Sequence, residues 1–264
     1  MEVRRVEPFT LCGTGEINPG VILLRDSSIM DRALQTLDDY KLIATSGQFV
    51  IYNGVHKDQP LTVATAGIGG PATAIVLEEL SRAGGRVFIL VGSAQAIQHK
   101  IKIGDIIVPT SAIRVDGTSV RYLPPEFPCI PSIESIPIVS EISRAIAEAA
   151  GIDVHIGPVY STDAYYKEVE ESNDRVAYWG RLGVLAFDME TATLFSVATV
   201  RRIKSLSILV VESNIVKDLK KLEYEVGSKA EERIFKAEDS KIVAFRIALE
   251  TLRRILSPIK TPSE

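Results

Sequence analysis

The chain has 264 residues, of which 46% are hydrophobic, and its formal net charge is −4. This length is sufficient for one large core, and we expect a single α/β domain over residues 1–264. Because neither sign of charge is concentrated in a block, the sequence argues against a nucleic-acid partner and a polybasic membrane patch. A small-molecule ligand fits this composition better.

The apolar stretches, the two cysteines and the polar composition are also informative. Residues 1–7 contain no apolar leader core, and the long uncharged stretch 61–77 is interrupted by glycines and a proline, so we expect a soluble cytoplasmic protein. Cys12 and Cys129 lie far apart without metal-ligand spacing. We interpret them as reduced thiols and expect no metal site. Few Asn and Gln beside many Lys, Arg and Glu suggest a heat-adapted source.

Short apolar runs predict the strands. They lie, in chain order, at residues 21–24, 61–65, 87–91, 106–108, 184–187 and 206–211, and amphipathic patterns lie between them. Strands that are apolar at every position are buried on both faces. The pattern predicts a mixed or parallel sheet covered by helices.

Helix boundaries are marked by glycine and proline. A helix is expected from Pro71 to Gly84, with Ala72, Ile75, Val76 and Leu80 on its apolar face. The segment 116–137 carries five prolines from 123 onward and is expected to be an irregular surface connection. A last helix is expected at 228–256, with these residues facing the core: Ile234, Phe235, Ile242, Phe245, Leu249, Leu252 and Ile255.

Three segments carry the candidate chemistry. The first, 65–74, is a glycine-rich turn from a strand into a helix; it lacks the dinucleotide pattern and the lysine of a triphosphate loop. The second, 91–98, has small and polar residues at the end of a buried strand, which leaves room for a ligand. The third contains Asp188, Met189 and Glu190 before a helix, where an acidic residue is either a ligand-binding group or a helix cap.

Taken in this order, the segments resemble the nucleoside phosphorylase family, most closely its uridine phosphorylase branch. The likeness runs from about Pro19 to the final helix and includes the runs 104–105, 114–117, 126–128 and 189–190. It implies a central mixed β-sheet, partly barrel-like, flanked by helices. It also implies cleavage of the bond between ribose C1′ and a base, with inorganic phosphate as co-substrate and no cofactor.

The resemblance assigns roles to individual residues. Ribose would be held by Met189, Glu190 and Ser93, because a carboxylate accepts hydrogen bonds from two neighbouring hydroxyls and favours a cationic sugar. The base would contact Ala94, Gln95, Tyr165 and Asp188, although Tyr165 is equally compatible with a core position. The histidines His56, His99 and His155 match no family position and are interpreted as structural or surface residues.

The phosphate site departs from the family pattern. Ile29, Leu90 and Gly47 stand where family members have arginines, and guanidinium groups are what bind phosphate bidentately. Ser93 matches a phosphate-binding hydroxyl. Arg25 or Arg32 could serve the anion instead; otherwise each is a surface arginine beside Asp26 or Asp31.

Three hypotheses stay open at this stage. The first is a pentosyltransferase acting on a nucleoside, with catalysis resting on Glu190. The second is a nucleosidase in which water replaces phosphate and Glu212 acts as the base. The third is a nucleoside-binding subunit or sensor without turnover. By resemblance the chain forms a dimer-based homo-oligomer, up to a hexamer, or a mixed assembly with an active paralogue.

Overall fold

One mixed sheet organises the chain. The computed structural model describes residues 6–166, 173–218 and 228–257. Its strands are β1 (Gly20–Leu24), β2 (Asp39–Ser46), β3 (Phe49–His56), β4 (Gln59–Thr65), β5 (Val87–Ala96), β6 (Ile106–Val115), β7 (Val154–Thr162), β8 (Ala186–Asp188) and β9 (Lys204–Asn214).

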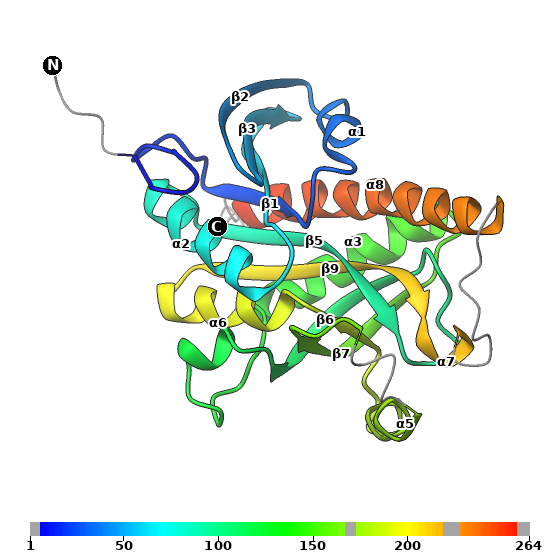
Figure 1. Cartoon of the computed structure of the whole chain (residues 1–264). Coiled ribbons are helices and arrows are strands. Elements are labelled where there is room, and N and C mark those ends of the chain that lie inside the picture. The colour runs from blue at the N-terminus through cyan, green and yellow to red at the C-terminus, as the bar shows by residue number, and fades with distance from the viewer. Residues whose placement is uncertain (1–5, 167–172, 219–227, 258–264) are drawn as a thin grey trace, which may run out of the picture.

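The sheet closes partly on itself. Within the described residues its order is β2-β3-β4-β1-β5-β8-β7-β6-β9, and β9 pairs with β5 as well as with β6. The ring β5-β8-β7-β6-β9 is therefore a small barrel, and the hairpin of β2 and β3 extends from the open side (Figure 1). The expected mixed, partly barrel-like sheet is confirmed.

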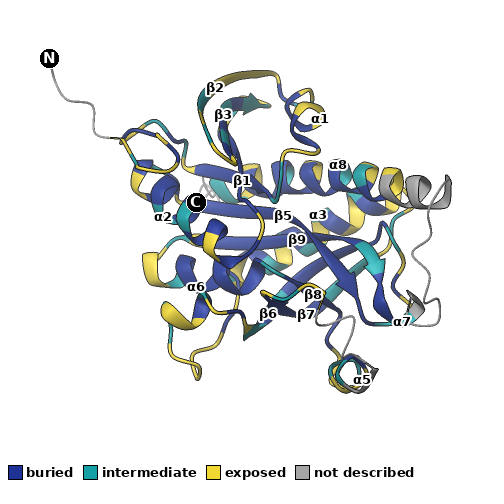
Figure 2. Cartoon of the chain, viewed as in Figure 1, coloured by how far each residue is buried: buried dark blue, intermediate teal, exposed yellow. Residues whose placement is uncertain are grey.

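Helices cover both faces of this sheet. They are α1 (Met30–Leu34), α2 (Gly70–Ala83), α3 (Ile136–Ala149), α5 (Asn173–Arg181), α6 (Thr191–Arg201), α7 (Ile215–Asp218) and α8 (Ser228–Leu256). Helices α2 and α6 pack together on one side, whereas α3 and α8 pack together on the other, and the strands between them are buried (Figure 2).

The two cores explain the apolar strands. In β1, Val21 and Leu23 face the core under α2 and α6, whereas Ile22 and Leu24 face the core under α8. Strand β5 alternates in the same way. Because each residue of such a strand loses contact with water on one side or the other, an uninterrupted apolar run is favoured.

Several expected elements differ in extent. Strand β5 continues to Ala96, so Ser93 lies within a paired strand and not after it. The helix expected to be amphipathic after Glu190 is α6, whose residues from Thr191 to Ala198 are all buried because it lies between α2 and the sheet. The pattern of 228–256 gave the bounds of α8, but Phe235 is 64% exposed, and the side chain of Ile234 lies outside the described residues.

The connection 116–137 is irregular apart from two 3-10 turns, Ser119–Arg121 and Ile133–Ser135, and the start of α3 at Ile136. It does not lie wholly on the surface, because Asp116, Ser119 and Cys129 are buried. The Arg114 guanidinium donates to the carbonyls of Leu123, Pro124 and Phe127, which fixes the proline-rich part against β6.

Cys12 and Cys129 are both buried. Burial raises the pKa of the Cys129 thiol to about 11, which keeps it protonated. Among the described helices, none combines the length and apolar character needed to cross a membrane.

The close approach at the end of α2 allows a test of the fold. Gly84 has φ +140°, and a Cβ added there would lie 2.3 Å from the carbonyl oxygen of Ile17. We expect Gly84→Ala to lower the free energy of unfolding by at least about 2 kcal/mol, measured by equilibrium urea unfolding.

The matched control is Gly151→Ala. Gly151 has φ +67° with open space around the added Cβ, so only the backbone strain of about 1 kcal/mol is expected. Equal losses for the two variants would show that the contact with Ile17 does not constrain this turn.

Candidate active site

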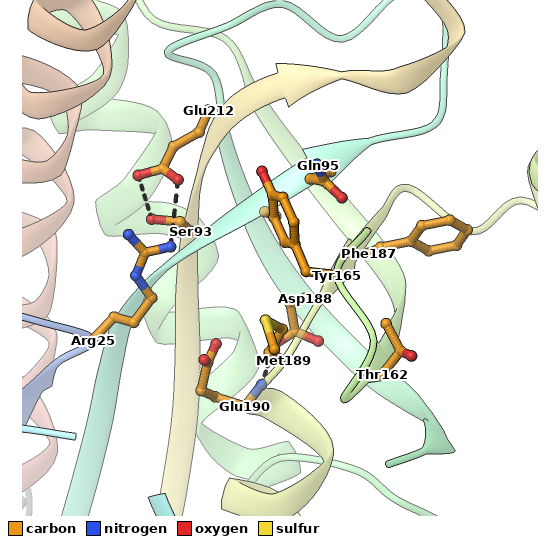
Figure 3. Close-up of a pocket in the computed structure, with 11 residues that line it drawn as sticks. Arg25, Ser93, Gln95, Thr162, Tyr165, Phe187, Asp188, Met189, Glu190 and Glu212 are labelled. Carbon is orange, nitrogen blue, oxygen red and sulfur yellow. Dashed lines mark hydrogen bonds and ion pairs between the residues drawn. The ribbon is translucent and has the colours of Figure 1, made fainter. Parts of the chain in front are cut away.

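One pocket lies where the barrel meets α6. Its empty space amounts to about 370 Å³, a volume that includes the open mouth of the pocket. Figure 3 shows its side chains converging from several strand ends. The residues that line it are Arg25, Ser93, Ala94, Gln95, Thr162, Tyr165, Phe187, Asp188, Met189, Glu190 and Glu212.

Strand pairing positions these residues. Arg25 follows β1, and its backbone N–H donates to Val91 in β5, so it continues the ladder that carries Ser93. Met189 and Glu190 link β8 to α6. Residues from segments far apart in sequence are therefore held by one closed set of strands, which favours a fixed site geometry.

Glu212 lies at an irregularity in β9. Ala94 pairs with Val211 and Gln95 pairs with Ser213, so Glu212 is the extra residue of a β-bulge. A bulge bends its strand and redirects a side chain. Glu212 is accordingly half-buried and accepts a hydrogen bond of 2.7 Å from the Ser93 hydroxyl.

The two acidic residues around Met189 have different roles. Asp188 is the helix cap: its carboxylate accepts from the backbone N–H of Thr191 at 2.7 Å and of Glu190 at 3.3 Å, and from the Ser161 hydroxyl. Complete burial raises its pKa despite these bonds. The carboxylate of Glu190 makes no cap contact with α6.

The Glu190 carboxylate is held by the glycine-rich turn. Its Oε1 accepts the backbone N–H of Gly69 at 2.8 Å, across 121 residues of sequence. Gly69 has φ +86°, a conformation that glycine adopts without strain and that lets its N–H point at the carboxylate. The glycine-rich turn therefore positions a pocket residue in addition to starting α2.

Glu190 is an unusual carboxyl group. Glu190 is only 1% exposed, yet its side chain lines the pocket. Burial, and secondarily the charge of Asp188, raise its pKa to about 8. A ligand that donates hydrogen bonds to this carboxyl group would favour its ionised form.

Glu212, which also lines the pocket, is paired with two positively charged side chains. Arg25 Nη1 lies 3.4 Å from Glu212 and its Nη2 lies 2.8 Å from Asp26, whereas Lys241 Nζ from α8 lies 2.7 Å from Glu212. Burial opposes the ionisation of Glu212, but Arg25, Lys241 and Ser93 outweigh it and lower its pKa. Burial likewise opposes the charge of Arg25, but Glu212 and Asp26 outweigh it and raise its pKa.

The remaining wall is less charged. It is formed by Ala94 and Gln95 of β5, Thr162 of β7, Phe187 of β8 and Tyr165. Figure 3 labels Gln95, Thr162, Tyr165 and Phe187. Tyr165 is 38% exposed, so the alternative of a core tyrosine is wrong. Burial raises the pKa of its hydroxyl, with the charge of Glu212 as the second cause.

All nine candidate site residues from the sequence lie in this one pocket: Arg25, Ser93, Ala94, Gln95, Tyr165, Asp188, Met189, Glu190 and Glu212. Arg25 lines the pocket, whereas Arg32 is at the surface, paired with Asp239. His56 pairs with Glu250 and His155 with Asp105, outside the pocket. In the described chain, no cluster of three or more His, Cys, Asp or Glu side chains is arranged to hold a metal ion.

Sequence reasoning missed four contributors. Thr162 and Phe187 occupy strand ends whose neighbours in space could not be deduced from spacing. The N–H of Gly69 carries no side-chain information. Lys241 lies on α8, where its place among apolar residues at helical spacing was the available sign of an inward-facing charge.

Comparison with known proteins agrees with this geometry. The family model described as "Phosphorylase superfamily" matches residues 20–253. The match covers the sheet, the pocket and most of α8. The chain belongs to the phosphorylase superfamily.

Individual relatives are nucleoside phosphorylases. The chain is 32% identical to guanosine phosphorylase of Halorubrum lacusprofundi over 93% of this chain and 98% of that protein. It is also 32% identical to uridine phosphorylase of Thermococcus kodakarensis, over 78% and 76%. The crystal structure of uridine phosphorylase from Vibrio fischeri superposes with a TM-score of 0.84 at 27% identity, covering 96% and 100%. The predicted resemblance to nucleoside phosphorylases is confirmed.

The raised pKa of Glu190 predicts a pH dependence of stability. Between its ordinary value of 4.5 and about 8, the folded protein binds a proton that the unfolded chain has released. The contribution of protonated Glu190 to the free energy of unfolding is therefore fully present below pH 4.5 and is lost as the pH rises to 8. We expect Glu190→Gln to melt near the wild-type temperature at pH 4.5 and a few degrees above it at pH 8, by calorimetry.

Glu126→Gln, at an exposed position of the proline-rich connection, is the control and should follow the wild type at every pH. A melting difference between Glu190→Gln and wild type that stays constant from pH 4.5 to 8 would contradict the raised pKa.

Proposed function

We propose that this protein cleaves the N-glycosidic bond of a nucleoside with inorganic phosphate as nucleophile. The products are ribose 1-phosphate and the free base. The pocket is the site of this pentosyl transfer, and no cofactor is required. The guanosine and uridine phosphorylases among its relatives support the reaction class.

The observation that carries the proposal is the position of Glu190. One carboxylate oxygen is fixed by Gly69, and the group lines the pocket beside Met189. The other oxygen is suited to accept from the 2′ and 3′ hydroxyls of ribose. As the bond from C1′ to the base breaks, positive charge develops on the sugar, and an ionised Glu190 stabilises that charge at short range.

Phosphate is suited to the opposite wall. Arg25 and the Ser93 hydroxyl lie within the same pocket as Glu190, so an anion held there would face the sugar. A phosphate oxygen would form the new bond to C1′, the electron pair of the old bond would leave with the base nitrogen, and a proton would neutralise the base. Holding both reactants in one pocket supplies the orientation that this displacement needs.

Hydrolysis is supported less well. A base that activates water works best with a pKa near the working pH and a free lone pair. Glu212 has a lowered pKa and is paired with Arg25 and Lys241, so it is a weak proton acceptor. A sensor without turnover would not need these cations beside the sugar. Self-association stays a prediction from the resemblance, and the cytoplasmic location stays a prediction from the sequence.

The proposal is tested by measuring released base. Purified protein is incubated with uridine, inosine, guanosine and adenosine, each with and without phosphate, and the base and ribose 1-phosphate are quantified by chromatography. We expect phosphate-dependent release from at least one nucleoside. Glu190→Ala should lower kcat/KM by about 100-fold or more, because the developing charge loses its counter-charge.

The surface variant Glu126→Gln should keep wild-type activity. Release of base at the same rate without phosphate would assign the protein as a nucleosidase, and nucleoside binding without release would assign it as a sensor. Unchanged nucleoside affinity and turnover in Glu190→Ala would exclude the ribose role of Glu190.

A further inference from the structure

Helix α8 places a buried lysine, Lys241, against Glu212, which lines the pocket. Lys241 lies on the face of α8 that includes Ala237, Ala244 and Ala248, all buried, and the residue is only 8% exposed. Its Nζ lies 2.7 Å from Glu212 Oε1. A charged side chain on an otherwise apolar helix face costs free energy unless it is paired, so this position calls for an explanation.

Three donors converge on the same carboxylate. Glu212 Oε1 receives Lys241 Nζ and the Ser93 hydroxyl, each at 2.7 Å, and Oε2 faces Arg25 Nη1 at 3.4 Å. They come from α8, β5 and the end of β1. We call Arg25, Ser93 and Lys241 the donor ring.

The donor ring matches the chemistry of a tetrahedral oxyanion. A carboxylate presents two oxygens and one negative charge, whereas phosphate presents more oxygens and up to two charges, so it can satisfy the same donors more fully. The Glu212 carboxylate therefore occupies a position that is suited to an external anion.

We propose that the donor ring binds the inorganic phosphate co-substrate and that Glu212 occupies the ring until phosphate displaces it. This inference rests on the phosphorolysis proposed above. It makes Lys241 a phosphate ligand, and it makes Glu212 an internal competitor that sets the affinity for phosphate.

The structure allows this displacement. The Glu212 side chain is 29% exposed and belongs to a bulge, so it has a path to water, whereas the Lys241 side chain is 11% exposed and stays inside. The contact of Glu212 with Arg25 is long. Once Glu212 leaves, Arg25 and Lys241 carry two positive charges, and Asp26 balances one of them.

An internal carboxylate also discriminates among anions. It competes at a high effective concentration, so a weak monoanion such as chloride cannot replace it. Only an anion that makes more or stronger bonds to the donor ring displaces it. The ring is therefore expected to select phosphate over the chloride of ordinary buffers.

The test measures phosphate and nucleoside affinities separately in the full chain. Four variants are compared with wild type by calorimetric titration with inorganic phosphate at constant ionic strength set by chloride: Lys241→Met, Glu212→Gln, the double variant of both, and Lys236→Met. Lys236 is exposed on the same helix, so its substitution makes the same charge change away from the pocket.

We expect Lys241→Met to weaken phosphate binding about 10- to 100-fold, as for the loss of a charged hydrogen bond, with nucleoside affinity changed less than twofold. Glu212→Gln should tighten phosphate binding several-fold, because the competitor loses its charge. Lys236→Met should behave as wild type. If Lys241→Met does not fold, the double variant is used, because it removes both charges of the pair. Its phosphate affinity is then compared with that of Glu212→Gln, and the same loss is expected.

Other results overturn the inference. If phosphate affinity is unchanged in folded Lys241→Met or in Glu212→Gln, the contact between Lys241 and Glu212 is only a structural ion pair. If a nucleoside 5′-monophosphate binds more tightly than its nucleoside, and Lys241→Met removes the difference, the donor ring binds a phosphate group carried on the substrate. If the protein releases base without phosphate and does not bind phosphate, phosphate binding by the donor ring is wrong, but cleavage of the glycosidic bond stands. If phosphate binds in a Lys241-dependent way but no nucleoside is cleaved, only the proposed function is wrong.

Discussion

The hydrogen bond from the Gly69 N–H to the Glu190 carboxylate is the constraint on which the site depends. It joins the turn between β4 and α2 to the junction between β8 and α6, which are 121 residues apart. The packing of α2 against α6 keeps these two starts adjacent. Because Asp188 caps α6, Glu190 is left to face the pocket.

The pocket places two carboxyl groups in opposite environments. Glu190 is enclosed and near the negative charge of Asp188, so its pKa is raised, whereas Glu212 is surrounded by Arg25 and Lys241, so its pKa is lowered. Divergent environments for paired titratable groups indicate divergent roles. In the proposals above, Glu190 binds the sugar and Glu212 holds the place of an anion. Under these proposals, Lys241 on α8 supplies a positive charge to a site in which Ile29, Gly47 and Leu90 stand where the resemblance predicts arginines.

Much of the architecture followed from local pattern. The apolar runs located β1, β4, β5 and β9, because a strand buried on both faces needs no alternation. The strand-to-helix junction at Met189 located the pocket residues of the third segment. Pattern failed where tertiary contacts decide: the hairpin of β2 and β3 and the strand β7 are only half-buried in places, and their mixed sequences gave no clear period.

Most of the residues that line the pocket were predictable from the sequence, but their arrangement was not. Ser93, Glu190 and Glu212 were identified from their segments, but the bulge that turns Glu212 toward Ser93 depends on pairing between β5 and β9. Lys241 was missed because a single lysine in a helix normally faces solvent. Its burial follows from how α8 crosses the sheet, which is a long-range property of the fold.

A crystal structure with a bound C-nucleoside tests the central claim most directly, because the carbon–carbon link to its base resists cleavage and the complex persists. The account predicts that both ribose hydroxyls lie at hydrogen-bond distance, about 2.5–3.0 Å, from Glu190 while the Gly69 N–H keeps its bond to Oε1. A ligand whose ribose contacts neither Glu190 nor Met189, or a Glu190 side chain turned from the pocket into the core, would contradict it.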